Sequence, residues 1–96
     1  MTTETVRSFV SQVTVGNRDY TTDIAIEISM HEPFFITVSA HYDGLIVESV
    51  LETVQGDIRD ATKEDDCLRL VRENNMIPKV SDDLAVAIGK KSHLLL

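Results

Sequence analysis

The side chains that could perform chemistry are few and widely spaced in this sequence. His41 and Asp43 stand two positions apart, a spacing that could place an imidazole and a carboxylate together at the end of a strand. A protein metal site needs three or four ligands, and the two other histidines, His31 and His93, have no companion at ligand spacing. We therefore expect no metal centre here, and a small enzyme would rest on nothing more than His41 and Asp43.

Cys67 is the one candidate nucleophile. A catalytic thiol needs a nearby base and surroundings that stabilise the thiolate. Asp65 and Asp66 directly precede Cys67 and disfavour the thiolate, so we expect a core residue on a helix. The four glycines lie far apart and form no phosphate-binding loop. These observations predict a protein that is not an enzyme and that uses no cofactor.

Length and composition predict a single folded domain over residues 1–96. The chain is 43% apolar and 26% charged, which is ordinary for a globular protein that buries its own core. A single cysteine excludes an internal disulfide and suits a reducing compartment. The first residues do not resemble a signal peptide, and no apolar run is long enough to span a membrane. We therefore expect a cytoplasmic protein without membrane contact.

Negative charge is concentrated in the first part of the chain. The net charge is −7, and residues 1–56 contain eight acids but only two bases. Such a surface repels nucleic acid and anionic lipid and attracts a basic protein surface. The alternative is that the charge serves solubility alone.

Period-two patterns predict two antiparallel strands, at residues 22–30 and 34–42. In each, apolar side chains alternate with polar or smaller ones. Residues 5–15 show some helical spacing, but they consist mainly of Thr, Val and Ser and are predicted to form a third strand. Gly16-Asn17 supplies the tight turn that joins this strand to the next.

Residues 41–54, HYDGLIVESVLETV, fit two structures. Asp43-Gly44 between apolar residues is a strong hairpin signal. The apolar residues after Gly44 also fall within one arc of a helix, with the polar residues opposite. The helix separates the two kinds of residue better, so we predict a helix over about 44–60 with Asp43 as its N-cap. If the segment is a strand, the sheet gains a fourth member.

Two more helices are predicted, at residues 63–75 after the cap Thr62 and at residues 82–91 after the cap Ser81. The predicted fold class is therefore α+β. A small antiparallel meander of three or possibly four strands over about 5–42 precedes a helical part over about 44–91 that packs on one face. Residues 92–96 form an apolar tail.

The most informative surface in this picture is acidic. The exposed sheet face carries Asp23 and Glu27, and the outward face of the first helix would carry Glu48 and Glu52. These four residues are the predicted partner-binding site of a non-enzymatic acidic protein-binding module. The sharper hypothesis is a small inhibitor that mimics nucleic acid and docks on a basic nucleic-acid-binding surface, as phage anti-defence proteins such as anti-CRISPR proteins do.

The alternative hypothesis is a structural or regulatory homo-oligomer. The sequence ends in three leucines, and grouped apolar residues of this kind often mark an interface. A homodimer would then form through Leu94, Leu95 and Leu96.

Overall fold

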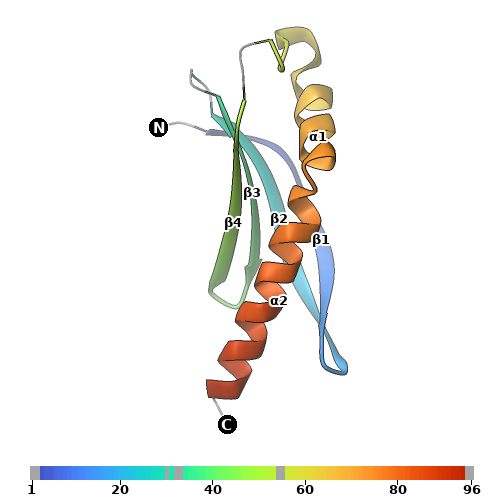
Figure 1. The fold of residues 1–96 in the computed structure, drawn as a ribbon, viewed down its shortest axis with the longest axis vertical. Coiled ribbons are helices and arrows are strands. Elements are labelled where there is room, and N and C mark those ends of the chain that lie inside the picture. The colour runs from blue at the N-terminus through green and yellow to red at the C-terminus, as the bar shows by residue number, and fades with distance from the viewer. Residues whose placement is uncertain (1–2, 30, 32–33, 54–55, 95–96) are drawn as a thin grey trace.

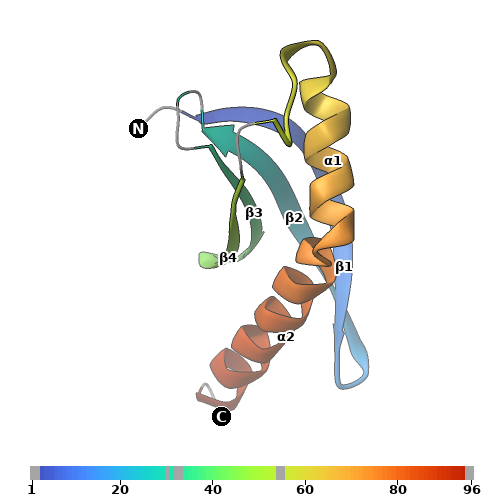
Figure 2. The ribbon, with the colours of Figure 1, turned by 45° about the horizontal axis from the view of Figure 1, so that its top comes forward.

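The computed structural model describes residues 3–29, 31, 34–53 and 56–94. Four antiparallel strands follow one another in the sheet in the order β1-β2-β3-β4, and helical segments follow them in the chain. Both long helices lie on the same face of the sheet (Figures 1 and 2). The α+β class is thereby confirmed, and of the two strand counts predicted, three or four, the structure has four. The elements are β1 Thr3–Val15, β2 Arg18–Ser29, β3 Phe35–Tyr42, β4 Leu45–Glu52, η1 Asp60–Thr62, α1 Lys63–Glu73 and α2 Met76–Leu94.

The three predicted strands are confirmed as β1, β2 and β3. The strand pairing brings Val15 opposite Arg18 and closes the first hairpin with the two residues Gly16-Asn17. Gly16 has a φ of +64°, a conformation that glycine adopts without the steric cost of a side chain. The β1–β2 hairpin extends beyond the end of the β3–β4 hairpin (Figure 1).

The predicted helix over 44–60 is wrong, because residues 45–52 form strand β4. Asp43 and Gly44 have φ values of +47° and +83° and make a two-residue hairpin turn, so Asp43 is not a helix N-cap. Pairing with β3 turns Leu45, Val47 and Leu51 toward the helices. The alternating residues Ile46 and Val50 are left facing solvent, which is why the strand pattern looked mixed on both faces. Residues 54–55 lie outside the described part of the chain.

The helical layer differs from the prediction at one end. The predicted helix over 63–75 is confirmed as α1. The second helix begins at Met76, well before Ser81, which therefore lies inside α2 and is not its N-cap. Pro78 occupies the first turn of α2, where the missing N–H has no intrahelical partner to lose. Neither described helix is long and apolar enough to cross a membrane.

The core lies between one face of the sheet and the helices. The sheet contributes branched side chains from its two central strands, and each of them is at most 1% exposed: Ile24, Ile26, Ile28, Ile36 and Val38. The helices contribute one buried side chain about every four residues, namely Cys67, Val71, Met76, Val80, Leu84 and Ile88. This spacing keeps one stripe of each helix against the sheet.

Asp66 organises the start of α1. Its Oδ2 accepts hydrogen bonds from the Arg59 backbone N–H at 2.9 Å and from the Thr62 hydroxyl at 2.6 Å. Thr62 is thus the residue before the helix, as predicted, but its hydroxyl donates to Asp66 and does not cap a backbone N–H. These two hydrogen bonds, first the one from Thr62, lower the pKa of Asp66 below its usual value.

Two glycine-to-alanine substitutions should have opposite effects on stability. Gly44→Ala places a side chain at a φ of +83° and should destabilise the protein by about 1–2 kcal/mol. Gly89→Ala lies inside α2, where the new methyl would make an ordinary 3.7 Å contact with Val15 Cγ1, and should stabilise by up to about 1 kcal/mol. Urea unfolding of both variants measures the sign of each change in the free energy of unfolding. Stabilisation by Gly44→Ala would contradict the hairpin, because that result is expected of a helix.

The low pKa of Asp66 predicts a pH-dependent contribution to stability. The ionised carboxylate stabilises the native state above the ordinary aspartate pKa of 3.8, and this contribution is lost as the pH falls through the lower native pKa. Asp66→Asn should therefore lower the melting temperature at neutral pH, and the difference from wild type should shrink in acid. Asp65→Asn, at an exposed neighbouring position, is the matched control in thermal unfolding followed by circular dichroism. Equal effects of the two variants would count against this role.

Candidate functional site

The face of the sheet that points away from the helices is open, and we call it the outer face. Strand pairing aligns its residues in rows across the four strands. One row contains Val10, Asp23, His41 and Ile46. The other rows contain Ser8, Ala25, Ser39 and Glu48, and then Thr5, Glu27, Thr37 and Val50. Both long helices lie on the opposite face, so the outer face is available to a partner.

All four predicted partner-binding residues lie on the outer face. Asp23 and Glu27 come from β2, as expected. Glu48 and Glu52 also lie there, because they belong to strand β4 and not to the outward face of a helix. The four residues thus share one face, although two of them reach it from a strand and not from a helix, and their role in binding a partner stays a prediction. Asp19, paired with Thr14 at the far end of the first hairpin, adds a fifth carboxylate.

The basic residues lie on the other side of the molecule. Seven of the nine follow residue 56 and belong to the helical layer. The two on strands also turn that way, since Arg7 pairs with Glu64 of α1 at 2.9 Å and Arg18 lies over the Tyr20 ring. Among the described residues, the outer face therefore carries five carboxylates and no lysine or arginine.

Three apolar side chains on the outer face were not identified from the sequence. Val10 is 64% exposed, and Ile46 and Val50 are each 58% exposed. Each stands at an outward position of an edge strand, so burial within the chain does not explain it. An apolar residue at an outward strand position was a usable sequence signal for Val10, but for Ile46 and Val50 it was hidden by the helix assignment.

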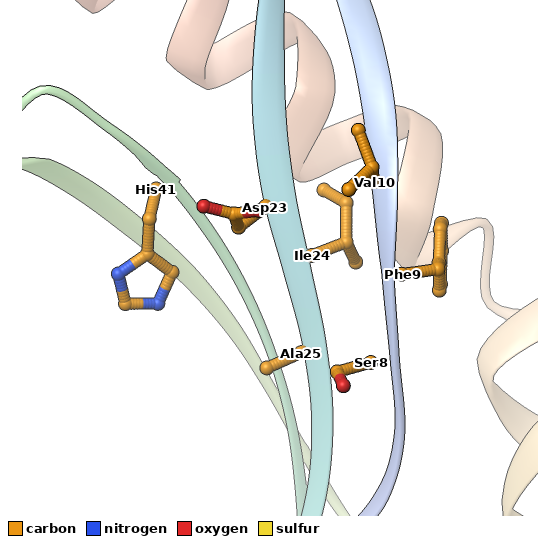
Figure 3. Close-up of a pocket in the computed structure, with 7 residues that line it drawn as sticks. All are labelled: Ser8, Phe9, Val10, Asp23, Ile24, Ala25 and His41. Atoms are coloured by element: carbon orange, nitrogen blue, oxygen red, sulfur yellow. The ribbon is translucent and has the colours of Figure 1, made fainter.

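A shallow hollow lies near the middle of the outer face. Ser8, Val10, Asp23, Ala25 and His41 contribute to its lining. Figure 3 shows the Asp23 side chain extending from β2 toward the side of the hollow where His41 lies. His41 Nε2 lies 3.0 Å from the hydroxyl oxygen of Ser39. Residue Ser39 is only 4% exposed. The hollow can therefore accept a small protruding side chain, with Asp23 able to pair with a positive charge.

The other sequence candidates are not assembled into a site. Asp43 lies in the β3–β4 turn, where its carboxylate pairs with Lys91 at 3.2 Å. Cys67 is buried in the core, as predicted, and burial raises the pKa of its thiol to about 11. Within the described part of the chain, no three His, Cys, Asp or Glu side chains come together in a way that could hold a metal ion.

The predicted self-association site begins at the end of α2. Leu94 is the last residue of α2, while Leu95 and Leu96 lie outside the described residues. Self-association through these three leucines stays a prediction.

No protein-family model matches this chain, and comparisons with curated proteins and with solved structures found no match. The outer face must therefore be interpreted from its own residues.

Proposed function

We propose that this protein is a non-enzymatic binding module whose outer face docks on a basic surface of another protein. The observation that carries the proposal is the separation of charge between its two sides. Five carboxylates occupy the outer face, and the described lysines and arginines lie on or point toward the helical layer. Charge serving solubility alone would not need to be sorted in this way. A one-sided field steers a basic partner toward one face and orients it there.

The apolar residues of the outer face support binding rather than solubility. Stable interfaces combine an apolar part that is dehydrated on contact with polar groups that fix orientation. The apolar part would consist of Val10, Ile46 and Val50. The polar groups would be Asp23 and Glu27, which lie in the same rows. We infer that the carboxylates set the orientation and the association rate, and that the apolar residues slow dissociation.

The arrangement of the carboxylates favours a partner surface that binds nucleic acid. Asp23 and Glu27 are four residues apart on β2, and so are Glu48 and Glu52 on β4. Because Glu48 is level with Ala25, the two strands alternate, and one carboxylate recurs about every 7 Å along the strand direction. These negative charges form a zigzag on two strands about 10 Å apart, and along the strand direction they recur at about half the axial charge density of one nucleic-acid strand. The protein would then act as an inhibitor by occupying the site of the nucleic acid.

Reversing the charge of the outer face should abolish partner binding and leave the fold intact. The variant Glu27→Lys, Glu48→Lys, Glu52→Lys should bind its partner at least about 100-fold more weakly, since three favourable charge pairs become repulsive. The matched control is Asp65→Lys, Asp82→Lys, Asp83→Lys, which makes the same change in net charge at exposed positions of the helices. Circular dichroism verifies that both variants fold.

The partner can be identified in the same experiment. Wild type and both variants are used to capture proteins from the source or host lysate, at low and high salt, and bound proteins are quantified by mass spectrometry. The proposal expects a basic nucleic-acid-binding protein that wild type and the helix control retain, that the outer-face variant loses, and that nucleic acid displaces. A partner retained equally by the outer-face variant, or unaffected by salt and nucleic acid, would reject the proposal.

A further inference from the structure

The two edges of the sheet are protected to different degrees. Edge strands expose unpaired backbone groups, and proteins usually protect them with charges, proline, irregular pairing or short length. β4 is eight residues long and carries Glu48 and Glu52. β1 is thirteen residues long, and its stretch Ser8–Val15 contains no charge, no proline and no glycine. The irregular pairing of β1 lies before this stretch, between Thr5 and Arg7.

The stretch Ser8–Val15 has the composition of a strand that pairs on both sides. Five of its eight residues are β-branched or aromatic, which favours pairing within a sheet. Counted from the two-residue turn after Val15, the backbone groups of Ser8, Val10, Gln12 and Thr14 point away from β2. In Figure 1 the end of the β1–β2 hairpin near this turn projects away from the helices, and the strand order places no other strand beside β1 on this side.

We propose that β1 pairs with β1 of a second copy of this chain, antiparallel and about a two-fold axis at Ser11. This interface is separate from the proposed docking of a basic partner. It would join the two sheets into one sheet of eight strands with both outer faces on the same side. An uncharged stretch of edge strand such as Ser8–Val15 is the natural contact for two copies of a chain with a net charge of −7.

Charge determines which edge can accept a second copy. In the proposed pairing the nearest carboxylates of the two outer faces are on the two β2 strands, three strand spacings apart, or about 14 Å. That separation exceeds the screening length of about 8–10 Å at moderate ionic strength. Pairing through β4 would instead place Glu48 and Glu52 on strands about 5 Å apart. Of the two sheet edges, β1 is therefore the one that a second acidic copy can approach with less repulsion.

The side chains of the stretch are complementary to themselves in this register. With Ser11 opposite Ser11 of the second copy, Phe9 lies opposite Val13 and Ser8 lies opposite Thr14. Aromatic side chains opposite β-branched ones, and hydroxyls opposite hydroxyls, are favourable cross-strand pairs. Each pair occurs twice because of the two-fold axis.

The test compares matched charge insertions on the two edge strands. Sedimentation equilibrium should give wild type twice its chain mass of 10.7 kDa. Val10→Lys places two like charges close to the axis and should raise the dissociation constant at least about tenfold. Val50→Lys makes the same change at a similarly exposed outward position of β4 and should leave the dimer unchanged. A monomeric wild type, or a dimer that resists Val10→Lys, would overturn the proposal.

The register has its own measurement. At a two-fold axis, one residue faces the same residue of the second copy. If that residue is cysteine and the two backbones are close enough, the two thiols can form a disulfide. Ser11→Cys should therefore give a covalent dimer on mild oxidation, and Ser8→Cys should not. A dimer that instead dissociates when Leu94–Leu96 are deleted, with no Ser11→Cys cross-link, would assign the interface to the tail and refute pairing through β1.

Discussion

The rest of this structure depends on one constraint: in the described part of the chain, the helices cover only one face of the sheet. The buried stripes of both long helices belong to one core cluster with Ile24, Ile26 and Val38, side chains that are at most 1% exposed. Antiparallel sheets tolerate this arrangement, because strands that alternate apolar and polar residues can face water on one side. The outer face is therefore free of the demands of core packing, while the inner face holds the fold together.

Much of the fold follows from sequence patterns whose physical cause is local. The alternation in β2 and β3 reports burial on one face only, and α1 has acids in its first turn where they suit the helix dipole. β4 was misassigned because Ile46 and Val50 face solvent, so that its apolar residues do not alternate with polar ones. The segment is a strand because it pairs with β3 and because Asp43 and Gly44 adopt the positive φ values of a hairpin turn. The start of α2 was missed because Pro78 suits either the end of one helix or the first turn of the next.

The sequence predicts the acidic residues of the candidate site, but it does not predict the exposed apolar residues beside them. Successive side chains of a strand point to opposite faces of the sheet. This alternation assigns Asp23 and Glu27 to the outer face correctly. Glu48 and Glu52 joined them only through the pairing of β3 with β4, which a single sequence does not specify. Val10, Ile46 and Val50 become recognisable as one surface only after the register aligns the four strands.

The central claim is that the outer face combines accessible apolar side chains with a negative potential that the helical side lacks. Paramagnetic relaxation of methyl groups by a cationic and by an anionic cosolute measures both properties in solution. Val86 of α2 is 57% exposed and lies near both acids and lysines, so it is an internal control of matched exposure. The account predicts that the cation relaxes Val10, Ile46 and Val50 much more strongly than the anion does, with a ratio closer to one at Val86. Equal ratios at all four residues, or protection of the outer-face methyls from both cosolutes, would contradict it.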